Sequence, residues 1–150
     1  MSELKKKLFD QCVEQIQMRM QAAQKAIDEA QKASNDDTKS SAGDKYETGR
    51  AMMQQETDRN LVQLNEANKL KVALNQVSTT GVADIVETGS LVITDNGNFY
   101  IAVSAGILNV NNESYFAISP ASPIGLKLKG LKMGDEFSLN GKQYLVKTVI

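Results

Sequence analysis

The chain has 150 residues, of which 41% are hydrophobic and 23% charged, and its formal net charge is −1. This length fits one or two small domains, and the near-zero charge argues against a dedicated nucleic-acid binder, which usually carries a basic excess. Histidine is absent and the one cysteine is Cys12, which excludes a Ser-His-Asp or Cys-His nucleophile, an internal disulfide and a cysteine-based zinc site. We therefore expect any contact with nucleic acid to run through another protein.

The sequence predicts a cytoplasmic protein with no membrane partner. A single cysteine suits a reducing compartment. The opening residues, MSELKKKLFDQC, are basic but lack the apolar core of a signal peptide. No run of residues approaches the roughly 18 apolar positions needed to cross a bilayer.

Residues 1–78 and 79–150 differ in composition. The first segment has no proline and two of the ten glycines, and it is rich in Gln, Lys, Glu, Ala and Met, which favour helix. The second segment holds the other eight glycines, both prolines and many Val, Ile, Tyr and Phe residues, which favour strands. We therefore predict an α+β protein with a helical domain over 1–78 and a sheet domain over 79–150.

A heptad pattern predicts a helix over residues 3–33, roughly 46 Å long at about 1.5 Å per residue. Its apolar positions are spaced 4-3-4-3-4-3, which is typical of helices wrapped on one another. We expect Cys12, beside this seam, to be a small packing residue. The seam positions are Phe9, Val13, Ile16, Met20, Ala23, Ile27 and Ala30.

The pattern resumes less regularly in a second helix, where Thr57 and Asn60 interrupt it. The two helices are joined by the polar stretch SNDDTKSSAGD, residues 34–44. A short polar connection favours an antiparallel hairpin, so we predict an antiparallel coiled-coil arm with its tip at about 34–47. A coiled coil for dimerisation is an alternative, because a heptad pattern indicates how helices pack and not what they do. The expected seam positions of the second helix are Met53, Leu61, Leu64, Leu70, Leu74 and Val77.

Four carboxylates, Asp36, Asp37, Asp44 and Glu47, gather at the predicted tip. The Asp-x-x-Glu spacing of the last two has the form of a capping box, in which both side chains satisfy free N–H groups of the first helical turn. Residues three apart also project from the same side of a helix. Together they could help to hold Mg²⁺ whose remaining ligands come from a partner. Capping and metal binding are compatible, and both stay open.

Short strands are predicted in the second half. Residues 90–95 and 99–104 flank Asn96-Gly97, and residues 136–139 and 142–150 flank Asn140-Gly141. Asn-Gly pairs suit two-residue hairpin turns, which need positive φ. A further strand is expected over 115–119. The result is a small, mostly antiparallel sheet that packing against the base of the arm would help to stabilise.

The stretch SPIGLKLKG, residues 122–130, predicts one or two helical turns, with Pro123 near the first position. Lys127 and Lys129 alternate with leucines there, and we interpret these lysines as a solvated edge. No phosphate-binding glycine-rich loop or nucleotide fingerprint occurs.

Residues 118–136 resemble the carboxy-terminal signature of the bacterial Gre transcript-cleavage factors. That signature has Ile-Ser, then Ser-Pro-Leu-Gly, a Leu-x-Gly step and Gly-Asp. The resemblance extends over about residues 85–150, including the strands on either side. The matching residues are Ile118, Ser119, Ser122, Pro123, Ile124, Gly125, Leu128, Gly130, Gly134 and Asp135.

The predicted tip resembles the tip motif of that family in the spacing of its Gly, Asp and Glu residues. The tip motif of the family is Gly-Asp-Leu-Ser-Glu-Asn-Ala-Glu-Tyr. Residues 43–49 of this chain are Gly-Asp-Lys-Tyr-Glu-Thr-Gly. The Gly-Asp-x-x-Glu frame is kept, which carries the two acidic tip residues of the family over to Asp44 and Glu47. The intervening residues and the later Glu-Tyr are not kept.

The resemblance implies an antiparallel coiled coil followed by a small FKBP-like domain. The coiled coil would enter the secondary channel of RNA polymerase. Asp44 and Glu47 would there help to position a Mg²⁺ shared with the polymerase, which cleaves backtracked RNA. Such a protein would be no enzyme by itself, would have no cofactor of its own, and would contact nascent RNA only indirectly. By the same resemblance, the loop of Ser122, Pro123, Ile124 and Gly125 is a candidate docking surface, and shaping the domain is its alternative role.

Two other functions stay open. One is a secondary-channel regulator of RNA polymerase that does not cleave, which the altered tip favours. The other is a coiled-coil adaptor or dimerisation protein. A monomer is expected for the first two functions, and a stable dimer zipped along residues 9–30 would favour the adaptor.

Overall fold

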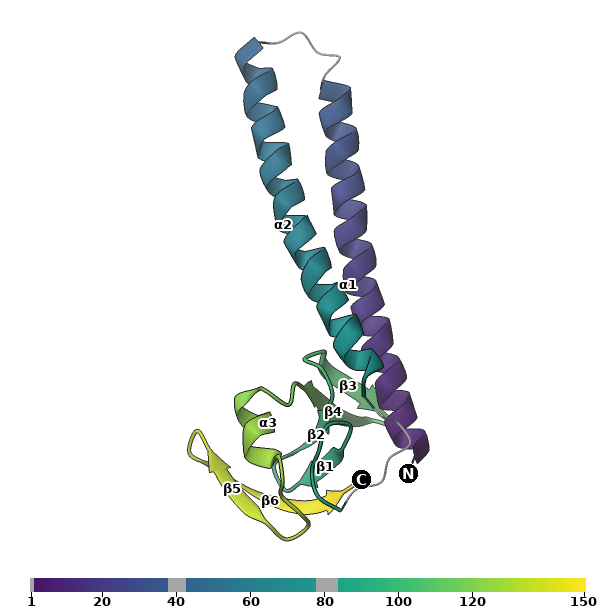
Figure 1. Ribbon diagram of the computed structural model, residues 1–150, viewed down its shortest axis with the longest axis vertical. Helices are drawn as coiled ribbons and strands as arrows, with labels where there is room; N and C mark the ends of the chain where they lie inside the picture. The colour runs from purple at the N-terminus through teal and green to yellow at the C-terminus, as the bar shows by residue number, and fades with distance from the viewer. Residues whose placement is uncertain (1, 38–42, 78–83) are drawn as a thin grey trace. The chain divides into compact units, whose positions relative to one another are not determined.

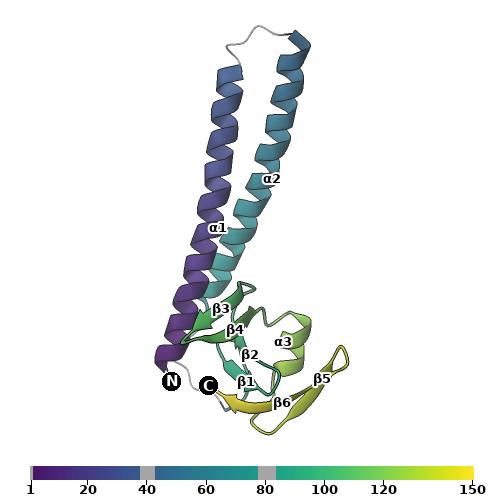
Figure 2. The ribbon, with the colours of Figure 1, turned by 180° about the vertical axis from the view of Figure 1, so that it is seen from behind.

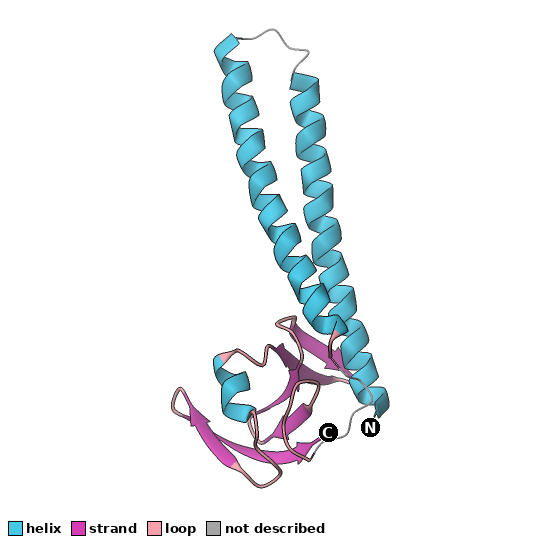
Figure 3. Cartoon of the chain, in the orientation of Figure 1, coloured by secondary structure: helices cyan, strands magenta, loops and turns pink. Residues whose placement is uncertain are grey.

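The computed structural model describes the backbone of residues 2–37, 43–77 and 84–150, and the side chains of residues 3–33, 51–77 and 84–150. The protein is α+β, with long helices first and a six-stranded sheet after them (Figures 1 and 3). Its contacts define two compact units, Ile16–Lys69 alone and Met1–Gln15 together with Leu70–Ile150. The predicted domain boundary near residue 78 stays a prediction.

Two long helices account for most of the first half of the chain. Helix α1 spans Ser2–Asp37 and helix α2 spans Gly43–Asn75, with 36 and 33 residues. Within residues 16–69 they run side by side in opposite directions in both views (Figures 1 and 2). Of the predicted heptad positions of α1, Ile16, Ala23, Ile27 and Ala30 are buried. Phe9, Val13 and Met20 are half-buried.

The predicted seam of the second helix is confirmed at Leu74 and Val77, which are buried, and differs at earlier positions. Leu61 is 42% exposed, whereas Thr57 and Ala67 are buried and Asn60 is half-buried. Thr57 and Asn60 therefore occupy the seam that they were expected to interrupt. Threonine and alanine have little apolar surface to bury, so a hydrophobic pattern does not identify their positions as part of the seam.

The sheet has the strand order β3-β4-β2-β1-β6-β5. All neighbouring strands are antiparallel except β2 and β4, which are parallel with Phe99 opposite Phe116. After β2 the chain therefore passes to the edge of the sheet, where it forms β3, and β4 then fills the position between β3 and β2. The strands are β1 Leu91–Thr94, β2 Gly97–Ile101, β3 Gly106–Val110, β4 Glu113–Ile118, β5 Glu136–Leu139 and β6 Lys142–Val149.

The hairpin turns confirm one prediction and correct another. Asn140 and Gly141 have φ of 53° and 80° and join β5 to β6, as a two-residue turn with both central φ angles positive requires. At the first hairpin, Thr94 pairs with Gly97, so the loop is Asp95-Asn96 and the predicted Asn96-Gly97 loop is wrong by one residue. Gly97 carries the positive φ there, 134°, as the first residue of β2.

Strand β3 was not predicted from the sequence. This strand reads GILNV and turns into β4 at Asn111 and Asn112, whose φ angles are 54° and 67°. Asparagine tolerates this left-handed region better than most residues. The Asn-Asn pair was thus a hairpin signal of the same physical kind as Asn-Gly.

The two faces of the sheet bury different side chains, because successive residues of a strand point to opposite sides. On one face, Val92, Phe99 and Ile101 belong to a core cluster completed by Leu128 of the short helix α3, Pro123–Leu128. The prediction of one or two helical turns over 122–130 is confirmed. On the other face, Tyr100 is completely buried.

The first part of α1, up to Gln15, covers that second face and is called the base of α1. Leu8 and Cys12 are completely buried, and Cys12 lies close enough to Tyr100 to influence its pKa. The side-chain amide of Gln11 donates to the Asn109 carbonyl at 2.6 Å and accepts from its N–H at 3.2 Å. This amide satisfies both backbone groups of Asn109 on edge strand β3, much as a neighbouring strand would. The expected packing role of Cys12 is confirmed, and its neighbour Tyr100 belongs to the sheet. The compact unit formed by residues 1–15 and 70–150 is called the sheet unit below.

Candidate functional site

The four predicted tip carboxylates lie where α1 ends and α2 begins. Asp36 and Asp37 are the last residues of α1, and Asp44 and Glu47 are the second and fifth residues of α2. Negative charge is favourable in the first turn of a helix. Their side chains lie outside the described residues, as does the connection 38–42. Their expected roles as helix caps and as Mg²⁺ ligands therefore stay predictions.

The docking loop predicted from the resemblance forms the start of α3. Ser122 is the N-cap, with φ −67° and ψ 159°, and Pro123 follows at the first helical position. The Ser122 hydroxyl accepts from the Gly125 N–H at 3.1 Å and donates to the Ser119 carbonyl at 2.6 Å. Serine and proline are favoured at these two positions, because one satisfies a free N–H and the other has none to satisfy.

Gly125 is required at this turn by a lack of space. A Cβ atom there would overlap the Ser119 carbonyl oxygen and would lie 2.9 Å from the Ser122 Oγ atom. The neighbouring oxygens belong to the cap itself, so they cannot move away without breaking it. Ser122 and Gly125 thus have clear structural roles.

Fewer residues of this loop are exposed than a docking surface made of all four would require. Gly125 is buried, Ser122 and Ile124 are half-buried, and Ile124 packs against the core cluster. Pro123 is exposed, and the neighbouring Leu126 is 64% exposed. Docking through this loop stays a prediction, and Pro123 is the one of its four residues that is well exposed.

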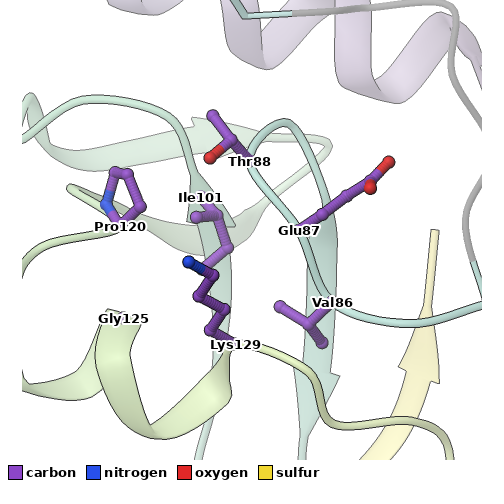
Figure 4. A pocket seen from close by; sticks show the side chains of 7 residues that line it. All are labelled: Val86, Glu87, Thr88, Ile101, Pro120, Gly125 and Lys129. Atoms are coloured by element: carbon purple, nitrogen blue, oxygen red, sulfur yellow. The ribbon is translucent and has the colours of Figure 1, made fainter.

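A pocket lies beside α3 and was not anticipated from the sequence. Its volume is about 370 Å³ (Figure 4). It is lined by residues of the loop before β1, of β2, of the turn after β4, of α3 and of the C-cap that follows α3. Lys127 and Lys129 are both exposed, as expected of a solvated edge, and Lys129 also lies in this lining. The two leucines differ from one another, because the segment is a helix with Leu128 buried and Leu126 exposed. The lining residues are Val86, Glu87, Thr88, Ile101, Pro120, Gly125 and Lys129.

Three titratable groups are buried where α1 meets the sheet. Burial raises the pKa of the Cys12 thiol to about 11, and burial followed by the nearby Cys12 raises the pKa of Tyr100 above its usual value. Burial lowers the pKa of Lys5, and the negative charge of Glu87 opposes this. All three shifts keep these groups in, or move them toward, their neutral forms, which suits packing and not proton transfer at neutral pH.

Tyr100 supplies a stability prediction. Its hydroxyl is buried and has no hydrogen-bond partner within the described part of the chain. We therefore expect Tyr100→Phe to raise the free energy of unfolding by about 1 kcal/mol, because it removes an unsatisfied polar group and keeps the ring. Urea unfolding would measure the change.

Tyr115→Phe is the matched control, because the Tyr115 hydroxyl donates to a Glu113 carboxylate oxygen at 3.2 Å. We expect that variant to be slightly less stable than the wild type. Destabilisation by Tyr100→Phe would mean that the hydroxyl does have a partner in solution.

Cys12 supplies a pH prediction. Below about pH 9 the thiol is protonated in both the folded and the unfolded state, so it contributes no pH dependence. Between about pH 9 and 11 the unfolded thiol ionises while the folded thiol, with its pKa at about 11, resists ionisation. Stability should therefore fall as pH rises through this range, by about 1–2 kcal/mol more in the wild type than in Cys12→Ala. Parallel urea titrations of the two proteins at pH 8, 9, 10 and 11 would measure it, and equal losses would contradict it.

Within residues 3–33, 51–77 and 84–150, no three acidic or cysteine side chains are grouped so that they could hold a metal ion. In the described ranges, no helix combines the length and apolar character needed to span a membrane.

Comparisons with known proteins give one distant structural likeness. No protein-family model matches the chain, and no curated protein gives a significant match. Among solved structures, the chain is similar to one described as "Structure of the transcription factor Gfh1". The two chains are 19% identical, 91% of each is covered, and the TM-score is 0.36. A likeness at this level assigns neither a family nor an activity to the chain.

Proposed function

We propose that this protein is a Gre-like factor that acts on RNA polymerase. The observation that carries the proposal is the Gre-like pattern of residues 118–136. In the fold, its central Ser122-Pro123-Ile124-Gly125 stretch forms a single capped turn beside the sheet. These four matching residues therefore belong to one local element of this chain.

The helices supply the second support. At about 1.5 Å per residue, α1 and α2 would each be roughly 50 Å long. Their buried seam includes Ala23, Ala30 and Ala67, whose small side chains add little bulk to the pair. We propose that the two helices form an antiparallel coiled-coil arm that enters the secondary channel, and that the sheet unit is the FKBP-like domain that docks on the polymerase.

Asp44 and Glu47 are the proposed acting residues. Mg²⁺ in proteins is often held by one or two carboxylates together with waters and phosphates. At the polymerase active site these two side chains would complete the coordination of the second ion, which activates water for phosphodiester hydrolysis. The protein would then be a cytoplasmic, monomeric accessory factor. Mg²⁺ would belong to the polymerase site, and contact with RNA would be indirect.

Transcript cleavage on a purified, deliberately backtracked elongation complex with Mg²⁺ tests this proposal. We expect the wild type to accelerate cleavage and the Asp44→Ala, Glu47→Ala double variant to lose that effect. The charge-matched control is Glu56→Ala with Glu66→Ala, which removes two exposed carboxylates from α2 away from the tip. Circular dichroism would establish that all three proteins are equally helical.

A non-cleaving regulator of the same channel is the second candidate, and the altered tip favours it. Between Asp44 and Glu47 this chain has Lys45 and Tyr46 where the Gre tip has Leu and Ser. In this case the wild type would bind core polymerase and change initiation without stimulating cleavage, and the double variant would behave like the wild type. Absence of polymerase binding would reject both candidates. A stable dimer in sedimentation would then favour the adaptor.

A further inference from the structure

We propose that the pocket beside α3 binds a small organic anion, namely a carboxylate carried on a short apolar body. The inference rests on the sheet unit alone and is independent of any action on RNA polymerase. It depends on three features of the pocket: a buried apolar floor, an unneutralised cation beside a hydroxyl, and a limited volume.

The floor of the pocket is apolar and built on the core. Val86 and Ile101 are each 2% exposed, and both belong to the core cluster that also contains Leu128. Pro120 and the buried backbone of Gly125 form the opposite wall. The Ser122 cap holds that wall in place. A floor of this kind exists before a ligand arrives, so binding costs little reorganisation.

Lys129 and Thr88 supply the polar contacts. In Figure 4 the Lys129 side chain extends across the pocket toward Pro120 and Ile101, and the Thr88 side chain lies above it. Across the described ranges, no carboxylate lies within ion-pair distance of the Lys129 ammonium group. An ammonium and a hydroxyl above an apolar floor can both donate to one carboxylate.

Glu87 does not neutralise this cation, although it also lines the pocket. Its carboxylate points away from Lys129 in Figure 4, and its charge acts on Lys5 of α1. Glu87 therefore forms no ion pair with Lys129. The lining thus carries one negative and one positive side chain, and Lys129 forms no ion pair within the described residues.

The size and charge of the pocket define the ligand class. About 370 Å³ is near the lower end for small-molecule sites. A single lysine acts as a point charge and suits a monoanion, whereas phosphate groups are usually held by several donors or by an arginine fork. The apolar floor requires an apolar body behind the carboxylate. A free carboxylic acid and the carboxyl end of a peptide share this chemistry.

Amide NMR titration of the ¹⁵N-labelled full chain would test the proposal, with hexanoate as the probe and hexanamide as its uncharged match. We expect saturable shifts at residues 86–88, 101 and 129 with hexanoate, and binding at least roughly tenfold weaker with hexanamide, because the charge-assisted contact is lost. Lys129→Met should weaken hexanoate binding by a similar factor and leave hexanamide unchanged. The control is Lys127→Met, an exposed lysine of α3 that does not line the pocket, which should bind as the wild type does.

A second arm distinguishes the sources of the carboxylate. Acetyl-alanyl-leucine with a free carboxyl end would be compared with its amide: tighter binding of the free acid than of hexanoate would assign the site to a peptide end, and weaker binding to a free small acid. The proposal is overturned if hexanoate gives no saturable shifts at these residues. Equal affinities for hexanoate and hexanamide, or an unchanged affinity in Lys129→Met, would overturn it as well.

Discussion

Gly125→Ala is expected to lower the free energy of unfolding by about 2 kcal/mol. The added Cβ atom would overlap the Ser119 carbonyl oxygen and press on the Ser122 hydroxyl. Both atoms belong to the hydrogen-bonded cap of α3. The cap must therefore open or α3 must shift, and overpacking of this kind typically costs about 1–3 kcal/mol.

The sign of this change separates packing from helix propensity. Alanine is the better helix former by about 1 kcal/mol, so propensity alone predicts that Gly125→Ala stabilises the protein. Urea unfolding followed by circular dichroism would measure the difference, with Lys127→Ala as the control at an exposed position of the same helix. If Gly125→Ala proved as stable as the wild type, the close approach of residue 125 to Ser119 would not exist in solution.

Leu8→Ala is expected to cost about 3 kcal/mol, although residue 8 is far from the sheet in the sequence. Leu8 is completely buried, and removing the bulk of a buried leucine typically costs about 2–5 kcal/mol. Because the first 15 residues belong to the same compact unit as residues 70–150, the loss should be felt by the sheet. Amide hydrogen exchange of strands β1 and β2 should accelerate accordingly.

Lys6→Ala is the matched control, since Lys6 is exposed on the same helix two residues earlier. It should leave both the unfolding midpoint and the exchange rates of the sheet within error of the wild type. If Leu8→Ala changed exchange in α1 alone, the base of the helix would not contribute to the core of the sheet unit.

The chain sequence by itself determined those features that depend on neighbouring residues. Asn140-Gly141 predicts its own turn, because only a few residue types accept two positive φ angles in succession. Ser122 and Pro123 predict the start of α3, because a cap and a proline act within one helical turn. The heptad spacing of Ile16, Ala23, Ile27 and Ala30 likewise predicts the buried face of α1 in this stretch.

Tertiary structure decided what depends on distant partners. Lys5, Leu8 and Cys12 are buried because the sheet covers that side of α1, whereas the heptads place the seam elsewhere. The parallel pairing of β2 with β4 has no local signal.

The candidate sites divide in the same way. The four tip carboxylates could be picked out from their position between two helices, but the ligands that would complete their site belong to another molecule. Gly125 is necessary because of the Ser119 carbonyl oxygen, and Lys129 faces a pocket because Val86 and Ile101 come from other segments. Local sequence fixes backbone preference over a few residues, while burial, close approach and charge neutralisation depend on groups that only folding brings together.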